Sequence, residues 1–210
     1  MSPANAQRRP EHGIADPKDA PSVERAERVF QRLDVSEIAP YPTREYVRKA
    51  AWMLVQATVY RAIPSRFPAI QNAVLRLFGA RIGKGTHLRR TARIRHPWLL
   101  TIGDYAAVGD NVDVYNLGPI IIGNHTTISQ NAHLCAGTHD YTKPHLPLVR
   151  AGITIGDGVW VCADAFIGPN VGVGDNCIVG ARAVVTRSVP ANTIVAGNPA
   201  KPVRERPMPG

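Results

Sequence analysis

The sequence predicts a mainly β protein: a parallel β-helix of about five triangular coils, with N-terminal helices and a C-terminal tail. Three observations predict it. From Ile82 onward an aliphatic residue followed by glycine recurs at a period of about six residues. The fifth position of each six-residue unit is usually small or β-branched. Hydrophobic residues make up 44% of the 210 residues but aromatic residues only 6%, which suits a narrow aliphatic core.

Each six-residue unit is interpreted as one side of a triangle. Position five and the next position one are two residues apart, so both side chains face the same way on a strand. The residues between them turn a corner, where Gly, Asn and Asp tolerate the backbone that is needed. Units begin at Ile82, Ile102, Val108, Ile122, Ile155, Ile167, Val173 and Val179, and the fifth positions are Thr86, Ala92, Ala106, Val112, Thr126, Ala132, Thr138, Val159, Ala165, Val171, Cys177, Ala183 and Val189.

Three sides close a coil of eighteen residues, as from Ile155 to Val173. Coil starts at Ile82, Ile102 and Ile122 are twenty apart, which we interpret as eighteen plus a two-residue bulge. The bulges fall at Leu100-Thr101 and Ile120-Ile121. The five predicted coils span residues 82–99, 102–119, 122–139, 155–172 and 173–190. At about 4.8 Å per coil the prism is roughly 24 Å tall.

The remaining segments divide the chain around this β-helix of residues 80–190. Residues 1–41 are expected to form a mobile polar arm with a short helix at Val23–Leu33. Residues 42–79 form a helical segment, with one helix from Thr43, as its cap, to Ala62 and another over Ala69–Phe78. Residues 191–210 form a C-terminal segment and tail.

The formal charge of +9 is concentrated before and at the start of the repeat. Between Pro42 and Arg95 there are twelve Lys or Arg and one acid, Glu45. Such a segment suits nucleic acid, an anionic membrane or phosphate-bearing ligands. We rank nucleic acid last because the sequence carries no nucleic-acid motif. The helix from Thr43 either packs on the prism or contacts an anionic membrane peripherally.

Cysteine usage and hydropathy point to the cytoplasm. Cys135, Cys162 and Cys177 fit neither a disulfide framework nor a CxxC metal pattern, so we expect reduced thiols. No signal peptide is visible. The longest apolar run, Ala50–Tyr60, is too short to cross a membrane.

One interruption of the repeat marks the candidate site. The six-residue rhythm stops from Asp140 to Thr154, and we expect the chain to leave the prism immediately after His139. Long loops on a rigid scaffold usually carry function.

Five stretches carry a family resemblance: LRLFGARIGKG (75–85), HPWLLTIGDYAAVGDNVDVYNLGPIIIG (96–123), ISQNAHLCAGTHDYTKPHLPL (128–148), IGDGVWVCADAFIGPNVGVGD (155–175) and VAGNPAKPVRER (195–206). Together they resemble the hexapeptide-repeat acyltransferases, more narrowly the O-acetyltransferases of exopolysaccharide synthesis of the colanic acid type. The resemblance covers about residues 43–206. It implies a left-handed coil and a homotrimer with active sites between subunits. It also implies acetyl-CoA as co-substrate and a sugar or lipid-linked glycan as acceptor.

His139, in the THDY motif, is the expected catalytic residue. Moving an acetyl group to a hydroxyl requires a base with a pKa near neutrality, and histidine meets that requirement. Asn116 and Asp113 are expected to hold the acceptor, although both residue types also favour turns. Asp140 and Tyr141 are expected either to orient His139 or to touch substrate, and loop stabilisation is the alternative.

The resemblance places the coenzyme along Trp160, Ala163 and Ala181, with Asn198, Lys201 and Arg204 at its adenine and phosphate end. Cationic side chains suit phosphates. Trp160 could instead pack under the 140–154 loop. Cys162 and Asp164 stand where relatives often carry other residues, which leaves the local coenzyme contacts open.

Two other function classes remain. One is a hexapeptide acyltransferase that acts on another hydroxyl or an amine. The other is a non-catalytic or metal-binding β-helix, like the hydratases of this scaffold that bind zinc through three histidines. No H-x₄-H pair occurs in the sequence, so we expect no metal.

Overall fold

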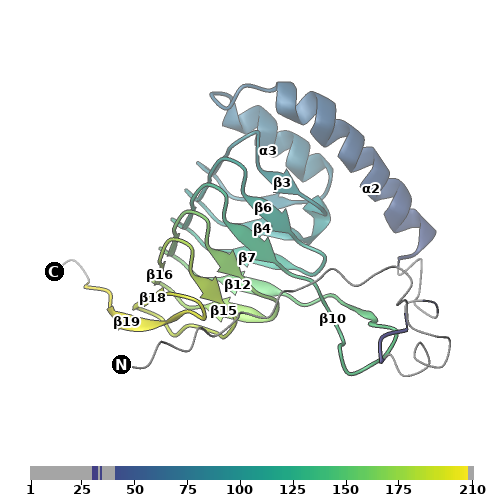
Figure 1. The fold of residues 1–210 in the computed structure, drawn as a ribbon. Coiled ribbons are helices and arrows are strands. Elements are labelled where there is room, and N and C mark those ends of the chain that lie inside the picture. Colours follow the sequence, from purple (N-terminus) through teal and green to yellow (C-terminus); the bar gives the residue numbers. More distant parts are fainter. Residues whose placement is uncertain (1–29, 33, 35–40, 208–210) are drawn as a thin grey trace, which may run out of the picture.

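The computed structural model describes residues 30–32, 34 and 41–207. Three parallel sheets form the sides of a prism, and the chain visits them in turn as a left-handed β-helix (Figure 1). Sheet A contains β1 (Arg81–Ile82), β4 (Leu100–Ile102), β7 (Ile120–Ile122), β12 (Ile153–Ile155) and β15 (Val171–Val173). Sheet B contains β2 (His87–Leu88), β5 (Ala107–Val108), β8 (Thr127–Ile128), β13 (Trp160–Val161), β16 (Ile178–Val179), β18 (Thr193–Ala196) and β19 (Lys201–Glu205). Sheet C contains β3 (Arg93–Ile94), β6 (Asp113–Tyr115), β9 (His133–Cys135), β14 (Phe166–Ile167) and β17 (Val184–Val185).

The strand registers confirm the predicted repeat. Ile82, Ile102, Ile122, Ile155 and Val173 stack one above another in sheet A. Every predicted fifth position is buried except Thr138, which is exposed. Burying each Ile or Val side chain of this column contributes about 1.5–3 kcal/mol, so the column stabilises the stacking of the coils.

The predicted two-residue bulges are wrong. Leu100 and Thr101 are paired ladder residues, opposite Ile120 and Ile121. The two additional residues of each early coil lie instead where the chain turns from sheet C to sheet A. There Pro97–Leu99 forms a short 3₁₀ turn (η4), and residues 116–119 form the equivalent turn one coil later. We call these turns, residues 95–99, 115–119 and 135–152, the C–A corner.

The coil count extends slightly beyond the prediction. Five coils close, and β18 then adds a strand to sheet B beside β16, which begins a sixth coil. Strand β19 turns back antiparallel to β18 and ends the sheet. The C-terminal segment therefore continues the prism.

Two helices cover the first coils. Helix α2 (Thr43–Val55) continues as a π-helical turn, η3 (Gln56–Tyr60), and α3 (Pro68–Leu77) follows. Thr43 is the first helical residue and not the cap, because Pro42 occupies the cap position. Trp52 of α2 is fully buried, and its indole N–H donates to the Ile94 carbonyl at 2.7 Å. The helix therefore packs on the prism, as one of the two sequence-based interpretations expected.

The outer faces of α2 and α3 remain apolar and exposed. Val47 is 66% exposed, Leu54 68% and Leu77 83%. None of the helices in the described part of the chain is long and apolar enough to span a membrane. The predicted helix at Val23–Leu33 falls mainly on residues outside those described, as does most of the predicted arm.

Candidate functional site

A β-hairpin projects from the C–A corner and carries His139. Strand β10 (Thr138–His139) pairs antiparallel with β11 (Leu148–Val149), and His139 lies opposite Leu148. The segment that carries β10 extends away from the prism (Figure 1). Ala136 is still fully buried in the prism, whereas Thr138 and His139 are exposed. The chain therefore leaves the prism before His139, and not after it as predicted. His139 is part of the hairpin itself.

The imidazole of His139 is held by one ring nitrogen. Its Nδ1 lies 2.6 Å from the Leu146 carbonyl oxygen, within the same hairpin. A carbonyl oxygen can only accept a hydrogen bond, so Nδ1 carries the proton. In the neutral ring this leaves Nε2 with a free lone pair. The hairpin thus presents an oriented base.

Asp140 organises the hairpin turn and does not contact His139. Its carboxylate accepts hydrogen bonds from the Thr142 hydroxyl at 2.5 Å and the Thr142 amide at 3.1 Å. These bonds hold the pKa of Asp140 below its ordinary value. Lys143 lies 3.5 Å away. Tyr141, at the tip, is 81% exposed and free to meet a ligand.

An ion pair fixes the return of the hairpin to the prism. Arg150 donates to both carboxylate oxygens of Glu45 in α2, at 2.8 and 3.3 Å. Its Nε also donates to the Leu117 carbonyl at 2.6 Å. Because Glu45 is 105 residues away in sequence, local pattern could not reveal this clamp.

Asn116 is a structural residue of the C–A corner. It is fully buried, and its side-chain oxygen accepts from the amides of Arg95 and His96 at 3.0 and 2.9 Å. Its side-chain nitrogen donates to the His96 carbonyl at 2.6 Å. Because these hydrogen bonds occupy the Asn116 side chain, its placement does not support the predicted contact between Asn116 and an acceptor.

His96 lies beneath the same corner and is fully buried. Its Nδ1 bonds the Asn116 carbonyl at 3.0 Å, and its Nε2 lies 3.9 Å from Glu45. Burial lowers the pKa of His96, although the Asn116 carbonyl opposes that shift. The ring is therefore neutral near pH 7.

Asp113 lies on the outer face of sheet C, in register with Arg93 on one side and His133 on the other. One carboxylate oxygen lies 3.2 Å from Arg95. The other oxygen, and the Nε2 atom of His133, are buried without a hydrogen-bond partner among the described residues. Buried polar atoms are normally hydrogen-bonded, so these two atoms are expected to bond a ligand, a water molecule or another subunit. Sequence reasoning missed Arg95 and His133, although the twenty-residue spacing between Asp113 and His133 indicated a shared ladder.

The predicted coenzyme residues gather on sheet B and on its corner with sheet C. Trp160 is 48% exposed on the outer face of sheet B, and its indole N–H donates to the Ser129 hydroxyl at 3.0 Å. Trp160 therefore does not pack under the hairpin, because the hairpin extends from the C–A corner and Trp160 lies on sheet B. Ala163 and Ala181 follow β13 and β16, one coil apart, while Asn198, Lys201 and Arg204 are exposed on and before β19.

The two groups of predicted residues do not meet within one chain. His139 and the hairpin lie at the C–A corner, whereas Trp160 and Lys201 lie on sheet B. A side of about six residues, up to about 20 Å long, separates them. Beside Trp160, a cavity of about 590 Å³ runs along sheet B, lined by residues that include His87, Thr127 and Ser129.

The described residues offer no metal site, and the three cysteines are unpaired. Within residues 30–32, 34 and 41–207, no group of three His, Cys, Asp or Glu side chains could hold a metal ion. Cys135, Cys162 and Cys177 are free thiols. Burial raises the pKa of Cys162 and Cys177.

Comparison with known proteins gives consistent matches. Residues 152–187 match the model of the bacterial transferase hexapeptide family (six repeats). A putative colanic acid biosynthesis acetyltransferase of Escherichia coli K12 is 44% identical over 160 residues, 76% of this chain and 88% of that protein. The galactoside O-acetyltransferase of the same organism is 32% identical over 51% of this chain and 48% of that protein.

Solved structures share the fold. A maltose O-acetyltransferase from Clostridium difficile 630 superposes with a TM-score of 0.72 at 20% identity, covering 80% of this chain and 90% of that one. A hexapeptide-repeat acetyltransferase from Vibrio cholerae, complexed with acetyl coenzyme A, superposes with a TM-score of 0.69 at 22% identity, covering 84% and 96%.

Proposed function

Because the chain belongs to the hexapeptide-repeat acetyltransferases and is an acyltransferase, we propose that it transfers acetyl from acetyl-CoA to a sugar hydroxyl in exopolysaccharide or cell-surface glycan synthesis. The observation that carries this proposal is the state of His139. Its Nδ1 is tied to the Leu146 carbonyl, and its Nε2 is left as the free base. The ring is exposed on a hairpin that leaves the scaffold.

The reaction proceeds by direct transfer. Nε2 of His139 takes the hydroxyl proton while the hydroxyl oxygen attacks the thioester carbon. The tetrahedral intermediate then collapses, the carbon–sulfur bond breaks, and the coenzyme A thiolate accepts the proton from the imidazolium. The Leu146 carbonyl stabilises the imidazolium through Nδ1. No covalent acyl-enzyme is required.

Acetyl-CoA is proposed to lie along sheet B. Trp160 supplies an apolar wall beside the pantetheine arm, with Ala163 and Ala181 as small residues that leave it room. Asn198 lies at the adenine end, and Lys201 and Arg204 meet the phosphates. The acetyl-CoA complex of the Vibrio cholerae neighbour supports this use of the fold.

A homotrimer is proposed because the two halves of the site lie at different corners of one prism. In a side-by-side packing about a threefold axis, one subunit's C–A corner meets its neighbour's sheet B. The coil that leads to His139 also carries Ser129, which Trp160 contacts. A neighbour's hairpin would therefore reach the height of Trp160.

Asp113 is the proposed acceptor contact on the sheet C face, with Tyr141 and the Asp140 turn at the hairpin tip. Asp113 has a carboxylate oxygen that no described residue satisfies. A sugar hydroxyl is a suitable donor to that oxygen.

Thiol release from acetyl-CoA, measured with a panel of free and glycan-linked sugars, tests the activity. We expect release with at least one sugar, and acetylated product whose acetyl group mild alkali removes, as for an ester. An alkali-stable product on an amino sugar would favour the N-acyl alternative. Absence of release with every hydroxyl and amine acceptor would contradict the proposal.

We also infer peripheral contact between the outer faces of α2 and α3 and an anionic membrane, and hence a location at its cytoplasmic face. Val47, Leu54 and Leu77 are exposed, and the segment around them carries twelve Lys or Arg against one acid. Flotation with anionic liposomes tests it. Val47→Gln/Leu54→Gln protein should float less than wild type, and equal flotation would end the idea.

A further inference from the structure

A cavity outside the groups described above lies between α2 and sheet C. Its volume is about 430 Å³, within the range of ligand sites. Tyr41, Lys49 and Arg61 line it from the helical side. Arg95, directly after β3, and Tyr115 of β6 line it from the prism. We call it the helix–prism pocket. Its cations come from three separate elements, and only the tertiary fold brings them together.

Two of the three cations, Lys49 and Arg61, are not neutralised by the described residues, and the third is only partly satisfied. Arg95 is shared with Asp113 at 3.2 Å. Neither Lys49 nor Arg61 forms an ion pair within residues 41–207, and the Glu45 carboxylate of the same helix is held by Arg150. The Nε atom of Arg95 is buried without a partner in the same part of the chain. Cations gathered without counter-charges favour an anionic ligand.

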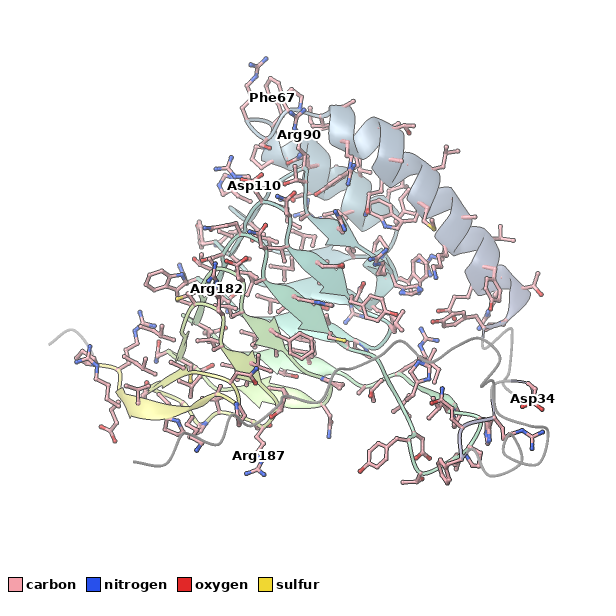
Figure 2. All side chains as sticks on the ribbon, in the orientation of Figure 1. Asp34, Phe67, Arg90, Asp110, Arg182 and Arg187 are labelled. Atoms are coloured by element: carbon pink, nitrogen blue, oxygen red, sulfur yellow. The ribbon has the colours of Figure 1, made fainter. Side chains whose placement is uncertain are left out.

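The positive charge continues beyond the pocket. Arg61 also lines an adjoining cavity of about 390 Å³, together with Arg90, Arg93 and Asn111. Arg90 lies near the helix end of the prism (Figure 2). Several spaced guanidinium and ammonium groups suit more than one phosphoryl group, since each can donate to separate oxygens.

Several of the other residues that line the pocket are apolar, unlike those of a site for a simple anion. Met53, Ala57, Ile94 and Leu117 give the helix–prism pocket an apolar lining beside its cations. A ligand with a diphosphate and an adjoining apolar or sugar group matches this mixture better than free phosphate does.

The pocket ends at the corner that carries the candidate base. Tyr115 and Leu117 line it, and the Tyr115 carbonyl accepts from the amide of Ala136 at 3.0 Å. Ala136 is three residues before His139. Arg95, in turn, joins the pocket to Asp113. A ligand anchored in the pocket could therefore extend a sugar along sheet C toward the hairpin.

From this arrangement we propose that the helix–prism pocket binds the diphosphate of a phosphate-linked glycan acceptor. The inference rests on the proposed acetyl transfer for its purpose, but the site is defined by its own chemistry. Lys49, Arg61 and Arg95 hold the phosphoryl oxygens, and the sugar projects to the C–A corner. The carrier beyond the diphosphate is either a nucleoside or a lipid.

Binding can be measured without turnover, by calorimetric titration of the full-length protein with inorganic pyrophosphate. Wild-type protein should bind it, and Lys49→Gln and Arg61→Gln should each weaken binding about tenfold, the loss of one charge-assisted contact. Arg187→Gln is the matched control, because Arg187 is exposed near the opposite end of the prism (Figure 2). It should bind as wild type does. Lys201→Gln separates this binding from pyrophosphate binding at the proposed coenzyme phosphates.

Two further titrations identify the carrier. Uridine diphosphate and farnesyl diphosphate share the anion but differ in the group attached, and the tighter binder indicates a nucleotide or lipid carrier. Both should lose affinity in the Lys49→Gln and Arg61→Gln variants. Absence of pyrophosphate binding, equal binding by all variants, or loss only in Lys201→Gln would overturn the pocket. None of these readouts depends on acetyl transfer, so failure of the proposed function would be seen separately in the thiol-release assay.

Discussion

The Glu45–Arg150 clamp should control how well the hairpin holds His139. Arg150 follows β11 directly, and its guanidinium bonds both Glu45 oxygens, at 2.8 and 3.3 Å. The side chains are 34% and 14% exposed. Removing one partner of a fully buried ion pair costs about 3–5 kcal/mol. An exposed pair contributes only about 0.2–1 kcal/mol. This half-buried pair should lie between, at about 2 kcal/mol.

If catalysis requires the docked hairpin, the loss of about 2 kcal/mol lowers kcat by up to about thirtyfold. We expect Glu45→Gln to approach that loss. Arg150→Gln should lower kcat further, because it also removes the bond to the Leu117 carbonyl. The assay is thiol release at saturating acetyl-CoA for wild type, both single variants and the double variant.

The double-mutant cycle isolates the contact itself. After Glu45→Gln, Arg150→Gln should add only the loss of its bond to the Leu117 carbonyl, which gives a coupling energy of about 1–2 kcal/mol for the ion pair. Lys84→Gln serves as the control, since Lys84 and Asp104 form an exposed pair at 3.9 Å. Fully additive effects of Glu45→Gln and Arg150→Gln on kcat would refute the clamp.

Two further predictions concern the coenzyme site and the buried histidine. Reversing both charges, Lys201→Glu with Arg204→Glu, should raise the KM for acetyl-CoA at least about tenfold through lost phosphate contacts; a change confined to the acceptor KM would contradict the assignment. For His96, burial depresses the folded-state pKa below its ordinary value of about 6.5. The unfolded state then binds more protons, so stability is present above about pH 6.5 and is lost as pH falls below it. His96→Gln should therefore lose less unfolding free energy between pH 7.5 and pH 5.5 than wild type, and an equal loss would contradict this role of His96.

The repeat could be predicted from sequence because its period is a local property. Ile82, Ile102 and Ile122 mark successive coils, and they stack in sheet A as the spacing predicts. The spacing could not locate the two additional residues per coil. Both placements preserve a twenty-residue period, and only the pairing of Leu100 with Ile120 decides between them.

The site could be predicted only in part, because its contacts join distant segments. His139 was indicated by its position at the break in the repeat, but Thr138 still fitted the six-residue rhythm although the chain had already left the prism. The hydrogen-bond partners of Asn116 come from the preceding coil, about twenty residues earlier in the sequence. These contacts make Asn116 a buried structural residue of the corner. No sequence pattern around Glu45 indicated that it pairs with Arg150, 105 residues away.

The most direct test of the central claim compares turnover and coenzyme binding in His139→Ala. If Nε2 of His139 is the base, kcat should fall by about 10² to 10⁴ while the dissociation constant for acetyl-CoA stays at the wild-type value. His125→Ala, which removes an exposed histidine stacked on Tyr105, should keep normal turnover. Near-normal kcat in His139→Ala would contradict the account.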